Sequence, residues 1–165
     1  MLKLLGSLCI LGGGILARCL QLAERRRRRD TLFDLLSAFR RMAEHVRMAR
    51  TPLPALLDTL ASTCGPDAAA FFSGVSSAVR QGEALPEIWK ALAEELPLNE
   101  ADKSAAAALG RDLQGDEETV CKAVSAVAYQ LAKSAEETER SRPEEEKRAT
   151  ALWFSAAALL VILLI

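Results

Sequence analysis

The two ends of the chain are apolar, and this feature limits the possible architectures more than any other. From Leu4 to Leu22 only three residues are polar or charged, and residues 151–165 ("ALWFSAAALLVILLI") carry no charge. As helices these segments would measure roughly 28 Å and roughly 23 Å, close to the thickness of the hydrocarbon core of a bilayer. We therefore predict an N-terminal transmembrane helix within residues 1–24 and a C-terminal one within residues 149–165.

Basic residues flank both apolar segments on the side that faces the middle of the chain. Lys and Arg accumulate on the cytoplasmic side of membrane spans, so this arrangement predicts that residues 25–148 lie in the cytoplasm and that both termini lie outside. A secretory signal carries its positive charges before its apolar stretch, whereas here they follow it, which favours an uncleaved anchor. The expected topology determinants are Arg25, Arg26, Arg27, Arg28, Arg29, Lys147 and Arg148.

The arginine block, Arg25–Arg29, also permits a second interpretation. A membrane-tethered protein could use it to bind nucleic acid or anionic lipid, because consecutive arginines neutralise phosphates. The chain has a net charge of -1, however, and no aromatic residue is interleaved with the block to stack on bases. We keep this function as the alternative, and it predicts binding that weakens strongly with salt.

Residues 25–148 have the pattern of an all-α domain. Only 5% of the residues are aromatic, whereas alanine, the best helix former, is abundant. Apolar residues recur at the spacing of helices with one buried face, and Pro and Gly signals separate the segments. Short connections favour antiparallel neighbours, so we expect a cytoplasmic bundle of about six antiparallel helices between the two transmembrane helices. The predicted helices cover residues 32–46, 52–63, 66–82, 84–96, 99–113 and 116–142.

Several residues carry specific structural expectations. Thr51 is expected to cap a helix that has Pro52 in its first turn, and Asn99 to cap another in which Asp102 returns a hydrogen bond. Trp89 lies on an apolar stripe and is expected in the core. Pro143 is expected to kink or break the last helix before the second membrane segment.

The sequence contains no motif for catalysis or for cofactor binding. It lacks a phosphate-binding G-x-x-x-x-G-K-[ST] loop, a G-x-S-x-G elbow and an H-E-x-x-H helix. The single histidine, His45, excludes a His-rich metal site, and the four cysteines form no C-x-x-C pair. The carboxylates of residues 135–148 look like a solvated face, with a divalent-cation site as the weaker alternative. We therefore expect no enzyme and no catalytic, cofactor-binding or metal-binding residue.

The order of several segments resembles the stage III sporulation protein AB family. The similarity covers essentially the whole chain and includes "MLKLLGSLCILGGG" at the start, "TPLPALL" at 51–57, "GEALPEIWKALAEEL" at 82–96 and "LGRDLQGDEE" at 109–118. The family is similar to the inner-membrane platform proteins of type II secretion and type IV pilus systems. The resemblance implies a component of the channel complex between mother cell and forespore, located in the mother-cell membrane around the forespore.

The resemblance also implies a set of partners. These are an operon-encoded cytoplasmic ATPase of the secretion type and other membrane subunits, with a homo-oligomer as a further possibility, and neither nucleic acid nor a small-molecule substrate. The family brings no catalytic residues. Opposed charge on the first and last cytoplasmic helices suggests two docking surfaces for the ATPase, a basic face at Arg40, Arg41 and Arg47 and an acidic face at residues 136–146.

Overall fold

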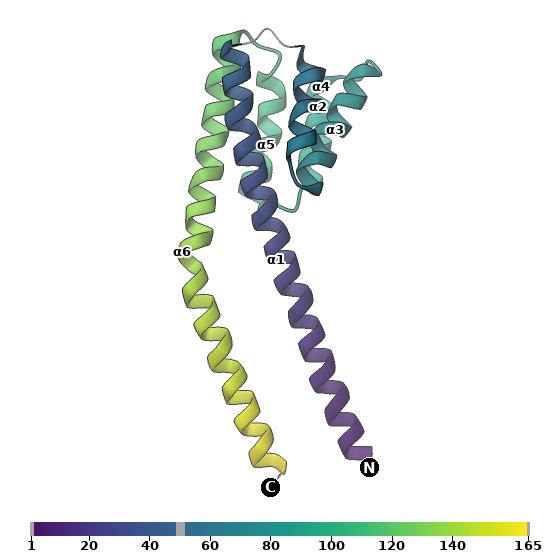
Figure 1. The fold of residues 1–165 in the computed structure, drawn as a ribbon, viewed down its shortest axis with the longest axis vertical. Coiled ribbons are helices and arrows are strands. Elements are labelled where there is room, and N and C mark those ends of the chain that lie inside the picture. The colour runs from purple at the N-terminus through teal and green to yellow at the C-terminus, as the bar shows by residue number, and fades with distance from the viewer. Residues whose placement is uncertain (1, 49–51, 165) are drawn as a thin grey trace.

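In a computed structural model of the chain, the described residues form six α-helices and no strand (Figure 1). The backbone is described for residues 2–48 and 52–164, and the side chains for residues 19–46 and 52–140. The all-α prediction is confirmed. The helices are α1 (Leu2–Met48), α2 (Leu53–Thr63), α3 (Pro66–Arg80), α4 (Leu85–Glu95), α5 (Glu100–Asp112) and α6 (Glu117–Leu164).

The first and last helices are much longer than predicted. α1 has 47 residues and α6 has 48, so neither bundle helix is separated by a break from the apolar segment beside it. The predicted bounds of the first and last bundle helices, 32–46 and 116–142, were therefore wrong. Arg, Glu and Lys are good helix formers, so the charged stretches continue the helix instead of ending it. Pro143 lies inside α6 and does not end it, although Figure 1 shows this helix bending near its middle.

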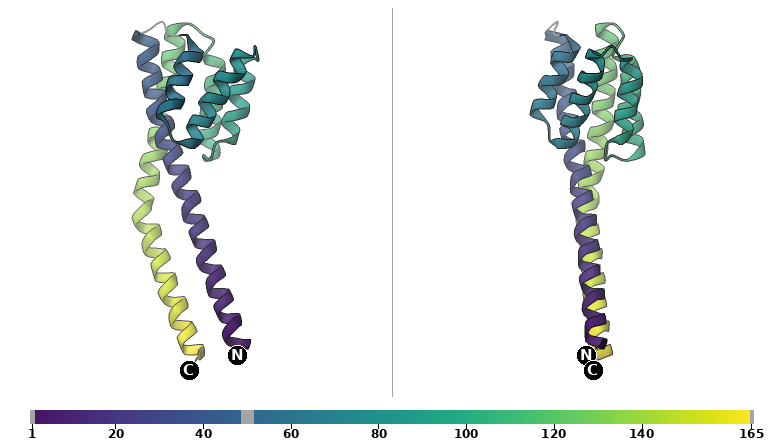
Figure 2. Two further views of the ribbon diagram at one scale, coloured as in Figure 1. Left: turned by 45° about the vertical axis from the view of Figure 1, so that its right-hand side comes forward. Right: turned by 90° about the vertical axis from the view of Figure 1, so that its right-hand side faces the viewer.

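The two long helices leave the bundle together. α2, α3, α4 and α5 pack against one half of α1 and α6, and the other halves extend away side by side, so that both termini lie at the same end (Figures 1 and 2). Just outside the bundle, residues 19–30 of α1 and 136–140 of α6 are exposed, apart from the partly buried Arg29. We call these two stretches the neck.

Within the described side chains, no helix contains a stretch long and apolar enough to cross a membrane. The predicted spans within residues 1–24 and 149–165 fall largely or wholly on residues 1–18 and 141–165, whose side chains lie outside the described part of the chain. Both transmembrane helices therefore remain predictions.

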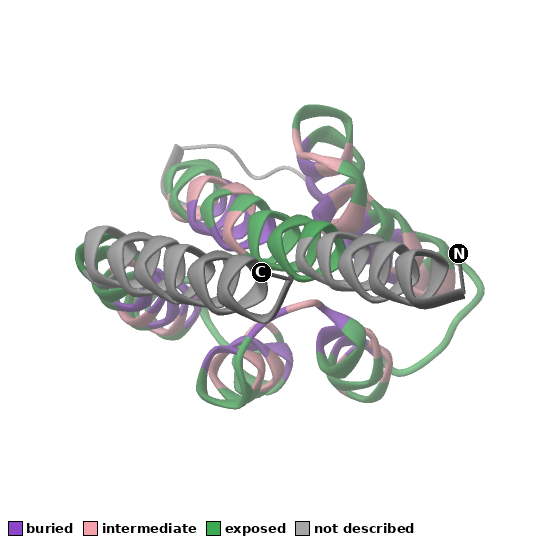
Figure 3. Cartoon of the chain, turned by 90° about the horizontal axis from the view of Figure 1, so that it is seen from below, coloured by how far each residue is buried: buried purple, intermediate pink, exposed green. Residues whose placement is uncertain are grey.

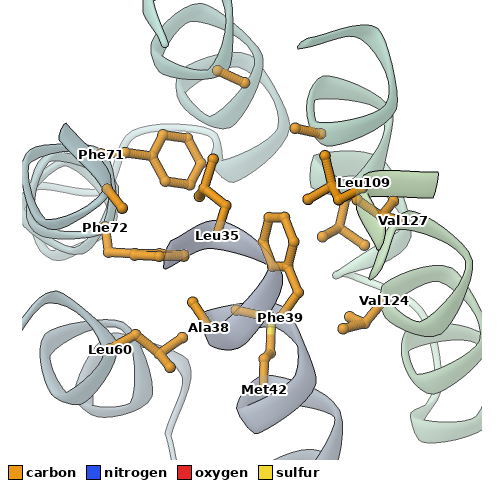
Figure 4. Packing of buried hydrophobic residues seen from close by; sticks show 14 of the residues in the cluster. Leu35, Ala38, Phe39, Met42, Leu60, Phe71, Phe72, Leu109, Val124 and Val127 are labelled. Carbon is orange, nitrogen blue, oxygen red and sulfur yellow. The ribbon is translucent and has the colours of Figure 1, made fainter. Parts of the chain in front are cut away.

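The bundle half of α1 passes through the middle of the core (Figure 4). Leu35, Phe39 and Met42 are fully buried there, and side chains from the other five helices surround them. Figure 3 shows that the buried sides of the helices face one another and the exposed sides face outward. The spacing of three and four residues along α1 places these side chains on one stripe, as predicted.

Trp89 of α4 is fully buried, as predicted, and anchors an aromatic cluster. Its ring stacks on Phe39 at a centroid distance of 6.4 Å and meets Phe71 edge-on at 4.9 Å. Its indole Nε1–H donates to the backbone oxygen of Ala106 in α5 at 2.8 Å, so the polar edge of the ring is satisfied. The ring thus links α4 to α1, α3 and α5.

Gly110 of α5 makes the position of Trp89 possible. A Cβ atom at this residue would lie 2.7 Å from Cβ of Trp89 and 2.8 Å from Cγ and Cδ1 of the same side chain. No real Cβ tolerates such distances, so only glycine allows α5 to approach the indole this closely. The core depends on this pair of residues, which belong to consecutive helices.

The helix ends agree with most of the local signals. α2 has Pro52 as its N-cap, not Thr51, which lies outside the described residues. The Oδ1 atom of Asn99 accepts from the backbone N–H of Asp102 at 2.7 Å, so this cap is confirmed. The Asp102 carboxylate was expected to return a bond to the cap residue, but the structure gives it a different partner. It is buried and accepts a 2.7 Å hydrogen bond from Ser134 of α6.

The Trp89–Gly110 contact generates a stability prediction. We expect Trp89→Ala in the full chain to lower the free energy of unfolding by about 3–5 kcal/mol, because it removes a large buried ring. Gly110→Ala should cost about 1–3 kcal/mol through overpacking. Denaturant titration of the purified full chain, followed by circular dichroism, measures both.

The double variant is the matched control. In a Trp89→Gly background, which also removes the Cβ atom of residue 89 that would lie 2.7 Å from a Cβ at residue 110, Gly110→Ala should be neutral or stabilising, because alanine is the better helix former in a helix interior. If Gly110→Ala is equally destabilising in both backgrounds, the close approach between these two residues is not the cause.

Candidate functional site

The arginine block surrounds α1 in the neck. Successive residues of a helix turn by about 100°, so five consecutive arginines point in all directions around the axis. Arg28 pairs with Glu24 at 3.4 Å and Arg29 with Asp30 at 3.1 Å, both on α1 itself. Exposed pairs of this kind contribute little to stability. Most side chains of the arginine block, Arg25–Arg29, are therefore exposed to solvent around α1, and we call this ring of charge the collar.

Arg27 is the exception, because it binds the bundle. Its Nε and Nη2 atoms donate to the two carboxylate oxygens of Asp67 in the first turn of α3, at 2.8 and 2.6 Å. The hydroxyl of buried Thr31 donates to the same carboxylate at 3.1 Å. A two-pronged pair between guanidinium and carboxylate fixes direction as well as distance. The hydrogen bonds between Arg27 and Asp67 lower the pKa of the Asp67 carboxyl group, although partial burial of that group acts in the opposite direction. The same hydrogen bonds raise the pKa of Arg27.

A second carboxylate, that of Asp34 in α1, holds the same end of α3. The Oδ2 atom of Asp34 accepts from the backbone N–H of Gly65, the N-cap residue of α3, at 2.9 Å. A Cβ atom on Gly65 would lie 2.4 Å from that oxygen, so any other residue there would force the Asp34 carboxylate to shift. The N-terminus of a helix favours negative charge, which suits both Asp34 and Asp67. Together with Arg27 and Thr31 these residues fasten the start of α3 to α1, and we call the set the α1–α3 clasp.

Sequence reasoning assigned the whole arginine block to topology and missed the clasp. Arg27 and Asp67 are 40 residues apart in the sequence, and no local sequence pattern predicts a pair at this separation. The sequence signal that exists is an acidic residue directly after Pro66 at a helix start, which indicates a favoured charge but not its partner. Lys147 and Arg148, the other expected topology determinants, lie outside the described side chains.

The expected basic docking face is divided. Arg40 and Arg41 are exposed on the bundle half of α1, as is His45. Because Arg40 and Arg41 are adjacent in a helix, their side chains leave it about 100° apart and do not share a face. The side chain of Arg47 lies outside the described residues.

The described part of the expected acidic face lies in the neck, opposite the arginine block. The thiol of Cys121 in α6 contacts the backbone oxygen of Ala43 in α1 at 3.7 Å, which fixes the antiparallel register of the two helices. Counting 16 residues along each helix from that contact brings Arg27 level with residue 137. The exposed carboxylates Glu136, Glu137 and Glu139 are thus at the height of the arginines, and residues 141–146 lie outside the described side chains. The charges of the neck largely balance.

The described residues offer little for catalysis or cofactor binding. They contain no group of His, Cys, Asp and Glu side chains that could hold a metal ion. The pKa of Cys64 is raised, first by burial and then by the nearby charge of Asp34, so its thiol is a poor nucleophile at neutral pH. Burial likewise raises the pKa of Asp102, whose carboxylate is occupied by Ser134. An open groove of about 550 Å³ between α4 and α5 is lined by lysines and alanines among other side chains.

Comparison with known proteins identifies the family. A family model described as "Stage III sporulation protein AB (spore_III_AB)" matches residues 3–165. The chain belongs to this family. Among solved structures, "Stage III sporulation protein AB (SpoIIIAB)" is similar with a TM-score of 0.65 and 17% sequence identity, covering 72% of this chain and 98% of that chain. At this identity the likeness concerns the fold alone. No curated protein matches the chain.

Membership of the stage III sporulation protein AB family agrees with the resemblance inferred from the sequence and supports a role in sporulation. The family match extends over α1 and α6 as well as the four short helices. The clasp, the collar and the divided basic face are thus features of a protein of this sporulation family.

The clasp predicts how the stability of this sporulation protein depends on pH. A carboxyl group whose pKa is lower in the folded state stabilises the fold above its unfolded value, 3.8 for Asp67, and this contribution disappears as the pH falls through the folded pKa. Asp67→Asn should therefore lower the melting temperature at pH 7, by less than Trp89→Ala does. The difference from the wild type should shrink below about pH 4. Thermal unfolding of the full chain at a series of pH values tests this.

Asp102→Asn is the matched control, with the opposite sign. The pKa of Asp102 is raised, so its burial destabilises the fold increasingly as the pH rises through the folded pKa. The asparagine variant should gain relative to the wild type over that range. If Asp67→Asn behaves in the same way, the pair with Arg27 does not stabilise the fold.

Proposed function

We propose that this sporulation protein is a non-enzymatic membrane platform in a secretion-like channel complex between mother cell and forespore. The observation that carries the proposal is the common exit of α1 and α6, which leave one end of the bundle and lead without a break toward the two apolar termini (Figure 1). A bundle held by two helices at one end presents its opposite end and its sides to the cytoplasm. The positive-inside pattern supports this orientation, with both termini outside.

The expected partners are a cytoplasmic ATPase of the secretion type and other membrane subunits. The chain itself lacks a phosphate-binding loop, so work done on the channel would come from the partner. Arg40, Arg41 and Arg47 are the proposed docking residues, and the first two are exposed on the bundle half of α1, away from the neck. A cytoplasmic ATPase could contact this part of the bundle without contacting the membrane.

The alternative is a membrane-tethered protein that uses the arginine block to bind nucleic acid or anionic lipid. The structure weakens it in two ways. Arg27 is engaged with Asp67, and three exposed carboxylates of α6 stand at the same height as the collar. Phosphates would meet acidic and basic groups together, which reduces the electrostatic gain on which such binding depends.

Topology is tested by labelling one introduced thiol. Cys64 and Cys121 are partly buried, so they would react slowly on either side of a membrane. Ser104 is exposed on α5, and we suggest Ser104→Cys in a chain whose four native cysteines are replaced. In intact cells this thiol should resist a membrane-impermeant maleimide and react fully after lysis. Labelling before lysis would contradict the orientation.

Docking is tested by reversing charge. The variant Arg40→Glu/Arg41→Glu should weaken co-purification of the co-expressed ATPase about tenfold, equivalent to about 1.4 kcal/mol, while helicity and membrane insertion stay unchanged. Lys90→Glu/Arg111→Glu on the α4–α5 groove is the matched control, and it should leave binding intact. Equal losses in both variants would indicate a general charge effect, and ATP hydrolysis by the purified chain alone would contradict a passive platform.

A further inference from the structure

One side of α1 stays exposed from the neck into the bundle. Successive residues of a helix turn by about 100°, so residues three, four or seven apart share a face. The exposed residues that leave α1 within about 40° of the direction of Arg26 include a set that we call the outer stripe: Cys19, Leu22, Arg26, Asp30 and Phe33. Leu35, which is fully buried in the core, points in the opposite direction.

The outer stripe contains two of the large hydrophobic side chains that are exposed in the described part of the chain. Leu22 is 50% exposed and Phe33 is 38% exposed. Phe33 lies nine residues beyond residue 24, the expected end of the first membrane span, which is about 14 Å along the helix. At this distance lipid does not cover the ring, so a protein surface is the partner that suits it.

Arg26 is the one arginine of the collar that binds nothing within the described residues, whereas the other four each interact with this chain. Asp30 lies one turn after Arg26 on the same face, but its carboxylate pairs with Arg29. Ion pairs between helix residues four apart favour the acidic residue first, as in Glu24 and Arg28, and the order of Arg26 and Asp30 is the reverse. The outer stripe therefore presents two opposite charges that do not satisfy each other.

A second copy of α1, aligned in parallel, complements this pattern. In a two-fold interface, if residue i contacts residue j of the other copy, then j also contacts i. The two Leu22 side chains meet each other, and so do the two Phe33 rings. Each Arg26 reaches Asp30 of the other copy across an offset of about 6 Å along the axis, which a long arginine side chain spans. Two reciprocal ion pairs result.

An antiparallel copy loses these matches. Centred on Arg26, it places Leu22 opposite Asp30 and the two Arg26 side chains opposite each other, and juxtaposed like charges are unfavourable. Copies anchored in one membrane with the same topology have parallel α1 helices. The arrangement that the outer stripe favours is thus the one that a common topology permits.

We propose that the outer stripe is a symmetric interface between two copies of this chain, whose α1 helices are parallel and cross in the neck. This rests on the membrane anchorage of the proposed platform and assigns it a surface for self-assembly. The contact from Cys19 to Phe33 extends about 21 Å along α1, and Arg40 lies two turns beyond it. The residues proposed to bind the ATPase therefore remain accessible in the pair.

Thiol crosslinking in membranes tests the interface through Cys19. In the full chain with Cys9, Cys64 and Cys121 replaced by alanine, Cys19 is the only thiol. The matched control adds Cys19→Ser and Leu20→Cys, which moves the thiol about 1.5 Å along the helix but about 100° around it, and residue 20 is also exposed. With a short bis-maleimide we expect Cys19 to give a covalent dimer and position 20 to give little.

Charge exchange tests the ion pairs. Arg26→Asp should lower the yield of the Cys19 dimer about tenfold, because Asp30 of the other copy then faces a like charge. Arg26→Asp/Asp30→Arg exchanges the partners of both reciprocal pairs and leaves the net charge unchanged. This double variant should recover most of the dimer.

The other results overturn the interface. These are equal dimer yields from the two thiol positions, no dimer, a crosslink to another protein only, or no recovery in the double variant. Labelling of Ser104→Cys and retention of the ATPase report on the platform separately. If both succeed while Cys19 gives no dimer, the outer stripe is wrong and the platform stands. If the dimer follows charge exchange but the ATPase is not retained, the platform is wrong and the pair of copies stands.

Discussion

Phe39 of α1 stacks on Trp89 of α4, and this contact joins the long helices to the short ones. Trp89 in turn reaches α3 through Phe71 and α5 through its hydrogen bond to Ala106. Four helices therefore meet at one indole, and α1 supplies the stripe on which they assemble. A bundle organised in this way keeps α1 at its centre, so whatever moves α1 moves the whole domain.

Most of the fold could be predicted because its signals are local. The buried stripe of α1, the burial of Trp89 and the Asn99 cap all follow from spacing and residue type within one or two turns of helix. The continuity of α1 and α6 was missed for a physical reason. The first predicted helix began at residue 32 and the last ended at residue 142, yet the arginines and glutamates beyond these bounds favour helix when nothing forces a turn.

The features that sequence reasoning could not supply depend on register between distant segments. Arg27 finds Asp67 across 40 residues, and Gly110 matters only because the ring of Trp89 lies against it. Similarly, Arg40 and Arg41 look equivalent in the sequence, but helical geometry and the position of α6 give them different neighbours. A residue's charge was therefore predictable, whereas its partner was not.

The unbroken helix through the neck has a consequence for how this chain tolerates changes in length. Deleting one residue between Leu20 and Glu24 would turn the bundle by about 100° and lower it by about 1.5 Å relative to everything before the deletion. α6 runs alongside without a break and would have to twist or stretch to follow. Apart from Arg27, which binds Asp67 of α3, most charged residues of the neck can be substituted with a change in local charge alone. Single-residue insertions and deletions instead rotate the entire domain about the helix axis. Length in this stretch is thus more constrained than composition.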